Sequence, residues 1–320
     1  MSENDTAGPR SADGAEEPPY RAGFACLIGR PNAGKSTLTN ALVGEKVAIT
    51  SSKPQTTRHT IRGIVNAPTS QLVLVDTPGL HKPRTLLGER LNDLVRETLL
   101  NVDVVGFCLP SDQRIGPGDQ FIARELVELR QARRTPVIAL ATKSDKVDRQ
   151  RLAEHLIAID QLGEWAEIVP CSATRGDQVD IVGQVLAKHL PTSPGPLYPD
   201  DVLTDEPMTV MIAELVREAA LEGVRDELPH SLAVVVEEMV PREDRPAGKP
   251  LMDVRVNVFV ERSSQKAIVI GRGGSRLREV GATAREGIEK LLGQRIHLDL
   301  HVKVAKDWQR DPKQLQRLGF

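Results

Sequence analysis

The feature that most constrains the fold of this 320-residue chain is an eight-residue run directly after the apolar segment Phe24–Ile28. The run consists of Gly29, Arg30, Pro31, Asn32, Ala33, Gly34, Lys35 and Ser36. This spacing is typical of a phosphate-binding loop between a strand and a helix. Glycines let backbone N–H groups approach the phosphates, the helix N-terminus adds its dipole, and the lysine reaches the outer phosphates. The alternative is a glycine-rich turn without a ligand.

A second motif follows the apolar run Leu72–Val75. It consists of Asp76, Thr77, Pro78 and Gly79. Alone it would usually be only a turn, but after a strand it would place a carboxylate beside a metal ion and the Gly79 N–H near the γ-phosphate. We therefore predict catalytic roles for Lys35, Asp76 and Gly79. The loop, Thr37 and this motif would bind the nucleotide, with Ser36 a direct ligand of Mg²⁺ and Asp76 acting through a water.

A third set of residues follows the apolar runs Val137–Ala141 and Ile168–Cys171. It consists of Thr142, Lys143 and Asp145 after the first run and Ser172 and Ala173 at the end of the second. The set resembles the base-recognition motifs of GTPases, in which Asp145 would accept from guanine N1 and N2. Adenine lacks this donor pair, so an unpaired buried carboxylate would disfavour ATP. Most members of the class have Asn at the position of Thr142, and we expect the guanine preference to survive.

The order of these segments predicts two domains and a tail. Residues 1–20 contain five acids, one arginine, three prolines and two glycines, a composition typical of a disordered acidic tail. Residues 21–190 alternate apolar runs with helix-like stretches, which predicts a doubly wound α/β GTPase domain. The proline-rich stretch 191–207 predicts a semi-rigid linker.

Residues 208–305 predict a smaller α+β domain, followed by a C-terminal tail over 306–320. A helix is expected over Met208–Leu221, strands over 232–239, 254–260 and 296–304, and a long helix from Ser275. The loop before that helix consists of Ile270, Gly271, Arg272, Gly273 and Gly274. In this order of elements it matches the Gly-x-x-Gly loop of a type II KH domain, and Arg276 adds positive charge. We predict that these six residues bind single-stranded RNA, whereas the alternative is a plain turn.

Bulk properties agree with this division. From Leu251 onward the chain has 14 Lys and Arg against 8 Asp and Glu, compared with 28 against 36 before it. Aromatic residues are only 3% of the chain, which argues against an RNA-recognition sheet built on stacking.

The three cysteines lie in or beside apolar runs and are expected to be buried hydrophobes. No run is long enough to suggest a membrane span, so we expect a cytoplasmic protein.

Together these motifs resemble the Era family of bacterial GTPases, within the TrmE-Era-EngA-like class and with a C-terminal KH domain. The resemblance runs from about Arg21 to Phe320 and also rests on Pro54–Arg58, Pro229–Ser231, Ser264–Gly274, Lys306–Trp308 and Arg317–Phe320. It implies that Thr57 is a second ligand of Mg²⁺ and takes part in catalysis, with Thr56 as the fallback. Departures are the acidic tail, Thr142, and Arg272 where relatives often have Lys.

The resemblance also bears on hydrolysis. In Ras-like GTPases a glutamine after the Asp-x-x-Gly motif orients the attacking water, whereas this chain has Leu80 there. Slow intrinsic turnover is therefore expected. Related GTPases with Asn at the position of Asn32 use a monovalent cation, preferably K⁺, in place of an arginine finger. The alternative for Asn32 is that it only stabilises the loop.

The function implied is a GTP-hydrolysing switch that binds the 3′ end of small-subunit (16S) ribosomal RNA and assists maturation of the 30S subunit. We expect a monomer that does not bind DNA. Some family members associate peripherally with the inner face of the cell membrane, although this sequence shows no anchor. The alternatives are a GTPase acting on another RNA or on a membrane-associated partner, and a non-hydrolysing RNA-binding adaptor.

Overall fold

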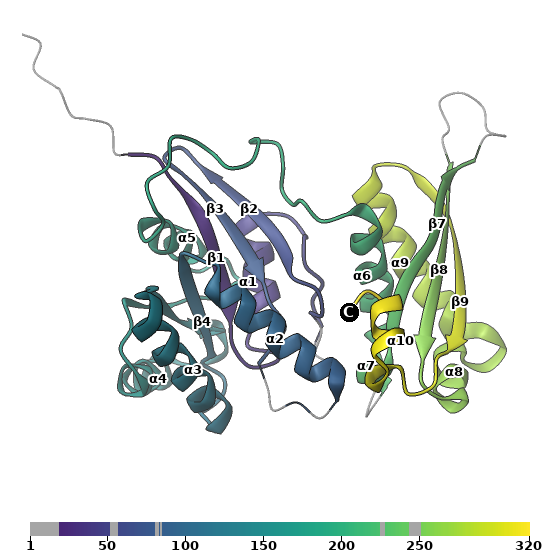
Figure 1. The fold of residues 1–320 in the computed structure, drawn as a ribbon, viewed down its shortest axis with the longest axis horizontal. Helices are drawn as coiled ribbons and strands as arrows, with labels where there is room; N and C mark the ends of the chain where they lie inside the picture. The colour runs from purple at the N-terminus through teal and green to yellow at the C-terminus, as the bar shows by residue number, and fades with distance from the viewer. Residues whose placement is uncertain (1–18, 52–56, 81–82, 84, 225–227, 243–250) are drawn as a thin grey trace, which may run out of the picture.

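The computed structural model describes residues 19–51, 57–80, 83, 85–224, 228–242 and 251–320. These residues form two domains that lie side by side and are joined by an extended connection (Figure 1). The first domain contains a six-stranded sheet and the second a three-stranded sheet. The expected acidic tail falls almost entirely outside the described residues. So do Pro54, Gln55 and Thr56 of the polar stretch Pro54–Arg58, which the sequence predicts to be a switch segment.

The first domain is the predicted doubly wound α/β sheet. Its strands are β1 (Arg21–Ile28), β2 (Ile61–Ala67), β3 (Ser70–Asp76), β4 (Val104–Pro110), β5 (Val137–Thr142) and β6 (Glu167–Pro170). Its helices are α1 (Lys35–Val43), α2 (Leu86–Leu100), α3 (Pro117–Arg133), α4 (Arg149–Leu162) and α5 (Val179–Lys188), with a 3-10 turn, η1 (Ser144–Lys146). The strand order is β2-β3-β1-β4-β5-β6, and neighbouring strands are parallel except β2 and β3.

Alternation along β1 explains why helices cover both faces of this sheet. Cys26 and Ile28 face a core that includes Val95 of α2, Ile122 of α3 and Ile159 of α4. The intervening residues of β1 face a second core with α1 and α5. That second core includes Ala25, Leu27, Leu38, Val182 and Leu186. Because both faces are buried, the central strands are nearly continuous apolar runs and can be recognised in the sequence.

Strand β2 was not among the predicted strands. It pairs antiparallel with β3 at the edge of the sheet, from Ile61 opposite Asp76 to Ala67 opposite Ser70. Along β2, Ile61 and Ile64 are buried, whereas Arg62, Asn66 and Ala67 are exposed. The sequence therefore lacks the continuous apolar run by which the other strands were recognised.

The connection between the domains lies along the β2–β3 edge. The fully buried side chain of Gln71 accepts hydrogen bonds from the backbone N–H groups of Leu197 and Tyr198, at 2.7 and 2.8 Å. The backbone N–H of Ile64 donates to the carbonyl oxygen of Leu203 at 2.9 Å. These contacts bind the expected linker to the first domain along much of its length.

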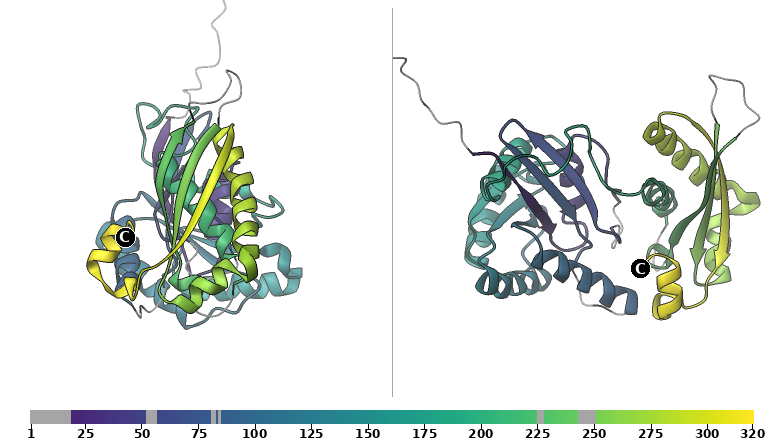
Figure 2. Two further views of the ribbon diagram at one scale, coloured as in Figure 1. Left: turned by 90° about the vertical axis from the view of Figure 1, so that its right-hand side faces the viewer. Right: turned by 45° about the horizontal axis from the view of Figure 1, so that its top comes forward.

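The second domain has the element order predicted for a type II KH fold. Its helices are α6 (Met208–Leu221), α7 (Leu228–Ser231), α8 (Ser263–Ile270) and α9 (Ser275–Leu292), and a 3-10 turn, η2 (Arg272–Gly274), contains the glycine loop. Its strands are β7 (Ala233–Pro241), β8 (Leu251–Val260) and β9 (Arg295–Val304), in the order β7-β8-β9. The three longest helices pack on one face of the sheet through residues such as Val216, Val269 and Ile288, as the left view of Figure 2 shows.

The segment 306–320, expected as a C-terminal tail, is folded. It contains a 3-10 turn, η3 (Trp308–Arg310), and a helix, α10 (Pro312–Arg317). Trp308 and Leu315 are fully buried in a cluster that also contains Leu87 of α2 and Phe259 of β8. The segment thus packs between the two domains. No local periodicity in the sequence reveals such a contact, since Leu87 and Phe259 lie far from this segment along the chain.

One prediction from composition is confirmed by the structure. Cys26, Cys108 and Cys171 are free and buried, as their apolar neighbours predict. Within the part of the chain that the structure describes, no helix is long and apolar enough to cross a membrane.

Candidate functional site

The phosphate-binding loop connects β1 to α1 through residues with left-handed backbone conformation. Gly34 has φ +93° and Asn32 has φ +63°. A Cβ atom on Gly29 would lie 2.7 Å from the carbonyl oxygen of Cys108 in β4, so only glycine fits there. The loop therefore curls tightly around the N-terminus of α1, where unpaired N–H groups attract an anion.

Lys35 crosses beneath this loop. Its Nζ donates to the carbonyl oxygens of Gly29 and Arg30, each at 3.2 Å. Burial lowers the pKa of Lys35, whereas the nearby carboxylate of Asp76 raises it. A buried ammonium held by two neutral carbonyl groups has capacity for a strong anionic partner, which fits phosphate oxygens.

Ser36, Thr57 and Asp76 bring three side-chain oxygens together. Ser36 Oγ donates to Asp76 Oδ2 at 2.7 Å, and Thr57 Oγ1 donates to the same oxygen at 3.1 Å. The Ser36 and Thr57 hydroxyl oxygens lie 2.9 Å apart. Burial raises the pKa of Asp76, opposed by Lys35 and by these two hydroxyl groups.

This cluster fits a hydrated Mg²⁺ ion. Among the described residues, Asp76 Oδ1 is buried and has no hydrogen-bond partner. Hydroxyl and carboxylate oxygens are the ligands that Mg²⁺ prefers, and the ion usually keeps several waters. Ser36 and Thr57 would contact the ion directly, and Asp76 would accept from one of its waters.

At the carboxyl ends of β5 and β6 lie the residues expected to recognise the base. Asp145 Oδ1 accepts a 2.7 Å hydrogen bond from the Ser172 hydroxyl, whereas Oδ2 forms only a 3.8 Å ion pair with Lys146 Nζ, too long for a hydrogen bond, and can accept from a ligand. Thr142 Oγ1 donates to the carbonyl oxygen of Ala33 at 2.7 Å. The hydroxyl at position 142 therefore ties the base-recognition loop to the phosphate-binding loop. Lys143 has a left-handed backbone conformation, with φ +57°. Its Nζ donates to Asp112 Oδ2 at 3.4 Å.

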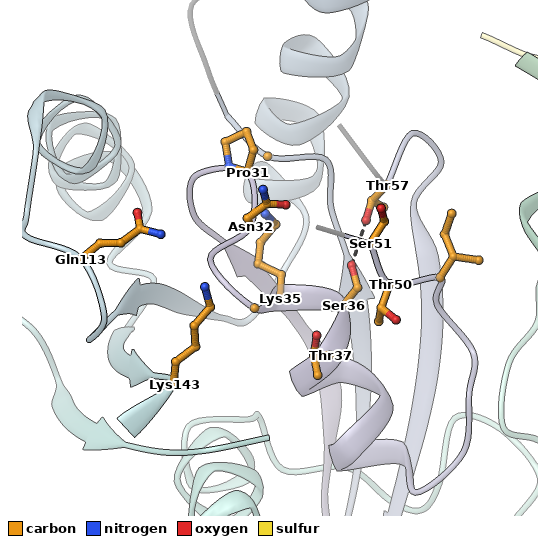
Figure 3. A pocket seen from close by; sticks show the side chains of 13 residues that line it. Pro31, Asn32, Lys35, Ser36, Thr37, Thr50, Ser51, Thr57, Gln113 and Lys143 are labelled. Atoms are coloured by element: carbon orange, nitrogen blue, oxygen red, sulfur yellow. Dashed lines mark hydrogen bonds between the residues drawn. The ribbon is translucent and has the colours of Figure 1, made fainter. Parts of the chain in front are cut away.

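A cavity of about 350 Å³ lies over the phosphate-binding loop. Of the predicted residues it is lined by Pro31, Asn32, Gly34, Lys35, Ser36, Thr37, Thr57, Gly79 and Lys143, and it is also lined by Ile49, Thr50, Ser51 and Gln113. Figure 3 shows Gln113 and Lys143 on the opposite side of this cavity from Ser36 and Thr57.

The sequence prediction missed these four lining residues. Gln113 follows the carboxyl end of β4, the sheet edge at which doubly wound folds bind ligands, so its position in the chain was a usable signal. Ile49, Thr50 and Ser51 lie just before the expected switch segment and carry no motif of their own.

The side chains of several predicted residues contact other parts of the domain and do not line the cavity. Arg30 directs its side chain to Asp119 of α3, with Nε 2.7 Å from Oδ1, so only its backbone serves the loop. Thr77 donates through its hydroxyl to the carbonyl oxygen of Leu27 at 2.8 Å. Leu80 is buried in the core with Ile28 and Val95, which agrees with the expectation that it orients no water.

The glycine loop of the second domain presents open backbone. Gly273 and Gly274 have positive φ, and no atom lies within 4 Å of a Cβ built on either of them. A Cβ on Gly271, in contrast, would lie 3.0 Å from the backbone nitrogen of Arg276, so glycine is required there. The loop surface is therefore free to receive a sugar-phosphate backbone.

The structure assigns Arg276 another contact. Its Nη2 donates to the carbonyl oxygens of Ala220 and Glu222, at 3.3 and 2.5 Å. These groups end α6, so this guanidinium caps a helix instead of facing a ligand. Ile270 packs against the core of the domain. The RNA-binding roles of Ile270 and Arg276 stay predictions, and short-range spacing in the sequence does not say which way either side chain points.

A groove of about 610 Å³ runs between α9 and β9. Its apolar lining includes Leu251, Leu277, Gly281, Ala282, Ile296, Leu298 and Leu300, and its polar lining consists of Arg242, Arg278, Arg285 and His297. An apolar floor with basic side chains suits bases and phosphates, respectively. This groove beside the glycine loop is the candidate nucleic-acid interface.

The fold and these two sites define a P-loop GTPase domain followed by a KH domain. A family of 50S ribosome-binding GTPases matches residues 24–143, and the KH domain family matches residues 227–309. The chain is 66% identical to the GTPase Era of Streptomyces coelicolor, over 97% of this chain and 98% of that relative. It is 64% identical to the GTPase Era of Mycobacterium avium, over 94% and 99% of the two chains.

A crystal structure of Era in complex with MgGDPNP and nucleotides 1506–1542 of 16S ribosomal RNA has a TM-score of 0.88 to this structure. The two sequences are 34% identical over 94% of this chain and 99% of that one. The chain therefore belongs to the Era family of GTPases and is an enzyme that hydrolyses GTP. The comparisons confirm the Era family that the motifs predicted, and they are more specific than the wider TrmE-Era-EngA-like class.

Proposed function

We propose that this chain is a cytoplasmic, Mg²⁺-dependent GTPase that binds the 3′ end of 16S ribosomal RNA and assists maturation of the 30S subunit. The observation that carries the proposal is the α9–β9 groove, which pairs an apolar floor with Arg278 and Arg285 beside an open glycine loop. The relative with TM-score 0.88 was crystallised with the same RNA region, which supports this choice of target.

The residues of the first domain have separate roles in this proposal. The loop amides and Lys35 hold the phosphates, and Gly79 presents its N–H toward the γ-phosphate. When bound through Ser36 and Thr57, Mg²⁺ supplies charge neutralisation between the β- and γ-phosphates. Asp145 accepts hydrogen bonds from the guanine base. A side chain that orients the attacking water is not provided at position 80, because Leu80 is in the core.

We further propose that Asn32 helps bind K⁺ next to the phosphates. Its support is that Asn32 lines the nucleotide cavity. The alternative also has support, because asparagine tolerates the positive φ of this position better than most residues do. Replacing Asn32 by glycine separates the two, since glycine keeps the conformation and removes the carboxamide.

Hydrolysis by the unmodified protein is expected to be about tenfold faster in KCl than in NaCl at equal ionic strength. Asn32→Gly should hydrolyse GTP at the slow rate in both salts. The measurement is phosphate release at saturating GTP. Equal rates of the unmodified protein in the two salts would rule out the potassium proposal and leave the loop-stabilising role.

The RNA proposal predicts that Gly273→Asp weakens RNA binding by at least about tenfold, because it places a carboxylate where phosphate would lie. The new side chain has space, since no atom lies within 4 Å of its Cβ, and aspartate tolerates φ +57°. Gly44→Asp is the matched control, because Gly44 also has positive φ and open surroundings but ends α1 in the other domain.

The measurement is fluorescence anisotropy of a short RNA that copies the 3′ end of 16S ribosomal RNA, with a scrambled RNA beside it. Each RNA is titrated with protein bound to a GTP analogue or to GDP. Selective, GTP-favoured binding that Gly273→Asp loses and Gly44→Asp keeps is the expected result. Binding that is indifferent to RNA sequence would contradict the 16S proposal and favour a GTPase that acts on another RNA.

A further inference from the structure

Arg58 is a buried cation directly after Thr57, and its partners belong to the second domain and the C-terminal segment. The residue is only 1% exposed. Its Nη1 donates to the carbonyl oxygen of Leu232. Its Cζ lies 5.7 Å from the ring centroid of Trp308 and 5.9 Å from that of Phe320. Removing a guanidinium from water is costly unless such contacts compensate, so they fix its position closely.

The two aromatic rings that contact Arg58, those of Trp308 and Phe320, are themselves held in place by further contacts. Trp308 Nε1 donates to the carbonyl oxygen of Ser231 at 3.0 Å. The Trp308 and Phe320 rings stack with centroids 5.6 Å apart. His59 stacks on the Phe320 ring at 5.0 Å, and Arg90 of α2 donates to the Phe320 carbonyl oxygen at 2.6 Å. Trp308 and Phe320 are therefore held against both domains.

A separate contact lies on the other side of the expected switch segment. Glu218 of α6 forms an ion pair with Lys46 at 2.5 Å. It also accepts a 2.9 Å hydrogen bond from the backbone N–H of Thr50, a residue that lines the nucleotide cavity. The chain thus contacts the second domain both before and after residues 52–56.

The position of Arg58 bears directly on the metal site. Consecutive Cα atoms are separated by about 3.8 Å, so anchoring Arg58 restricts the backbone of Thr57. The Thr57 hydroxyl lies 2.9 Å from Ser36 Oγ and 3.1 Å from Asp76 Oδ2, so a shift of the Thr57 backbone would move this hydroxyl out of the oxygen cluster. Errors of about 1 Å in the placement of a reacting group can lower a rate by about 10²-fold.

We infer that Arg58 is a positioning residue for GTP hydrolysis and that Leu232, Trp308 and Phe320 form the seat that holds it. The C-terminal half of the chain thereby helps to assemble the metal site of the N-terminal half. This inference rests on the proposed role of Thr57 as a ligand of Mg²⁺. It assigns communication between the domains to the side-chain contacts of Arg58, which act on the neighbouring Thr57, in addition to any movement of the connection over 191–207.

The test compares Arg58→Ala, Arg58→Lys, Phe320→Ala, Thr57→Ala and the double variant Thr57→Ala/Arg58→Ala in the full chain. For each, kcat and KM for GTP are measured across a range of Mg²⁺ concentrations. Affinity for GDP is measured separately in EDTA, and folding is followed by circular dichroism. Arg62→Ala is the matched control, because Arg62 is a partly exposed arginine of β2 whose ion pair is with Asp205 of the connection over 191–207, not with the second domain.

Arg58→Ala is expected to lower kcat about ten- to hundredfold and to raise the half-saturating Mg²⁺ concentration. Its GDP affinity in EDTA should stay within about threefold, since the phosphate loop is untouched. Phe320→Ala should act in the same direction with a smaller effect, Arg58→Lys should be intermediate, and Arg62→Ala should resemble the unmodified protein. The double variant should be no worse than Thr57→Ala, because both substitutions remove the same function.

The outcomes separate this inference from the proposed function. Normal Mg²⁺ dependence in Thr57→Ala would overturn both the metal role of Thr57 and the inference. If Thr57→Ala is impaired while the folded Arg58 and Phe320 variants behave like the unmodified protein, the inference alone is wrong. If Arg58→Ala does not fold, Arg58→Lys and Phe320→Ala decide.

Discussion

Replacing Lys35 by alanine is expected to lower the rate of GTP hydrolysis at saturating nucleotide by about 10²- to 10³-fold. The ammonium group is buried, and its two partners in the loop are neutral carbonyl oxygens of Gly29 and Arg30. Charge that develops on the phosphate oxygens in the transition state would therefore meet a preorganised cation from which water is excluded. Alanine removes that cation and leaves the loop glycines unchanged.

The measurement is phosphate release in a single turnover, with nucleotide in excess of its Kd for each variant. Lys35→Ala should remain folded, because burial disfavours the charge it removes, as the lowered pKa of Lys35 indicates. Lys188→Ala is the control, since Lys188 is an exposed lysine that pairs with Glu167. A Lys35→Ala protein that hydrolyses GTP at the normal rate would exclude Lys35 from catalysis.

Asp145→Asn is expected to weaken GDP binding by at least about 10²-fold and to improve binding of xanthosine diphosphate. The Ser172 hydroxyl donates to Asp145 Oδ1, so in the variant the amide oxygen would keep this bond and the NH₂ group would face the base. An NH₂ group cannot accept from the guanine N1 and N2 donors. It can donate to the carbonyl oxygen that xanthine carries at C2.

Competition against a fluorescent GDP gives both affinities. Asp148→Asn is the matched control, because Asp148 lies three residues away and caps α4 by accepting from the Arg151 N–H, a role that asparagine performs equally well. The same preference for GDP over xanthosine diphosphate in Asp145→Asn would show that Asp145 does not read the base.

Local motifs predicted several residues that the structure brings together at the phosphate-binding loop, and their roles in binding and catalysis stay predictions. In the loop from Gly29 to Ser36, the two glycines stand where the backbone adopts conformations that favour glycine, so their spacing in the sequence reflects the shape of the loop. Ser36, Thr57 and Asp76 were assigned from separate motifs, and the structure brings their oxygens together. The central strands were also predictable, because both of their faces are buried.

The remaining features depend on contacts between distant segments. Nothing near Arg276 in the sequence indicates that its guanidinium reaches the end of α6, and nothing near Trp308 indicates that it lies against Arg58. Strand β2 lacks a continuous apolar run because the exposed Arg62 and Asn66 interrupt it. The domain bounds proposed from the sequence, 21–190 and 208–305, stay predictions, as do the tail over 1–20 and the monomeric state.

The burial of Leu80 limits how substitutions can change the lifetime of the GTP-bound form in such an enzyme. A glutamine at this position would place a polar amide in the core with Ile28, Val75 and Val95, where an unsatisfied amide costs about 1 to 3 kcal/mol. Faster unassisted hydrolysis is therefore not available through this single substitution. The lifetime of the GTP-bound form must instead be adjusted from outside the core, by ions or by binding partners.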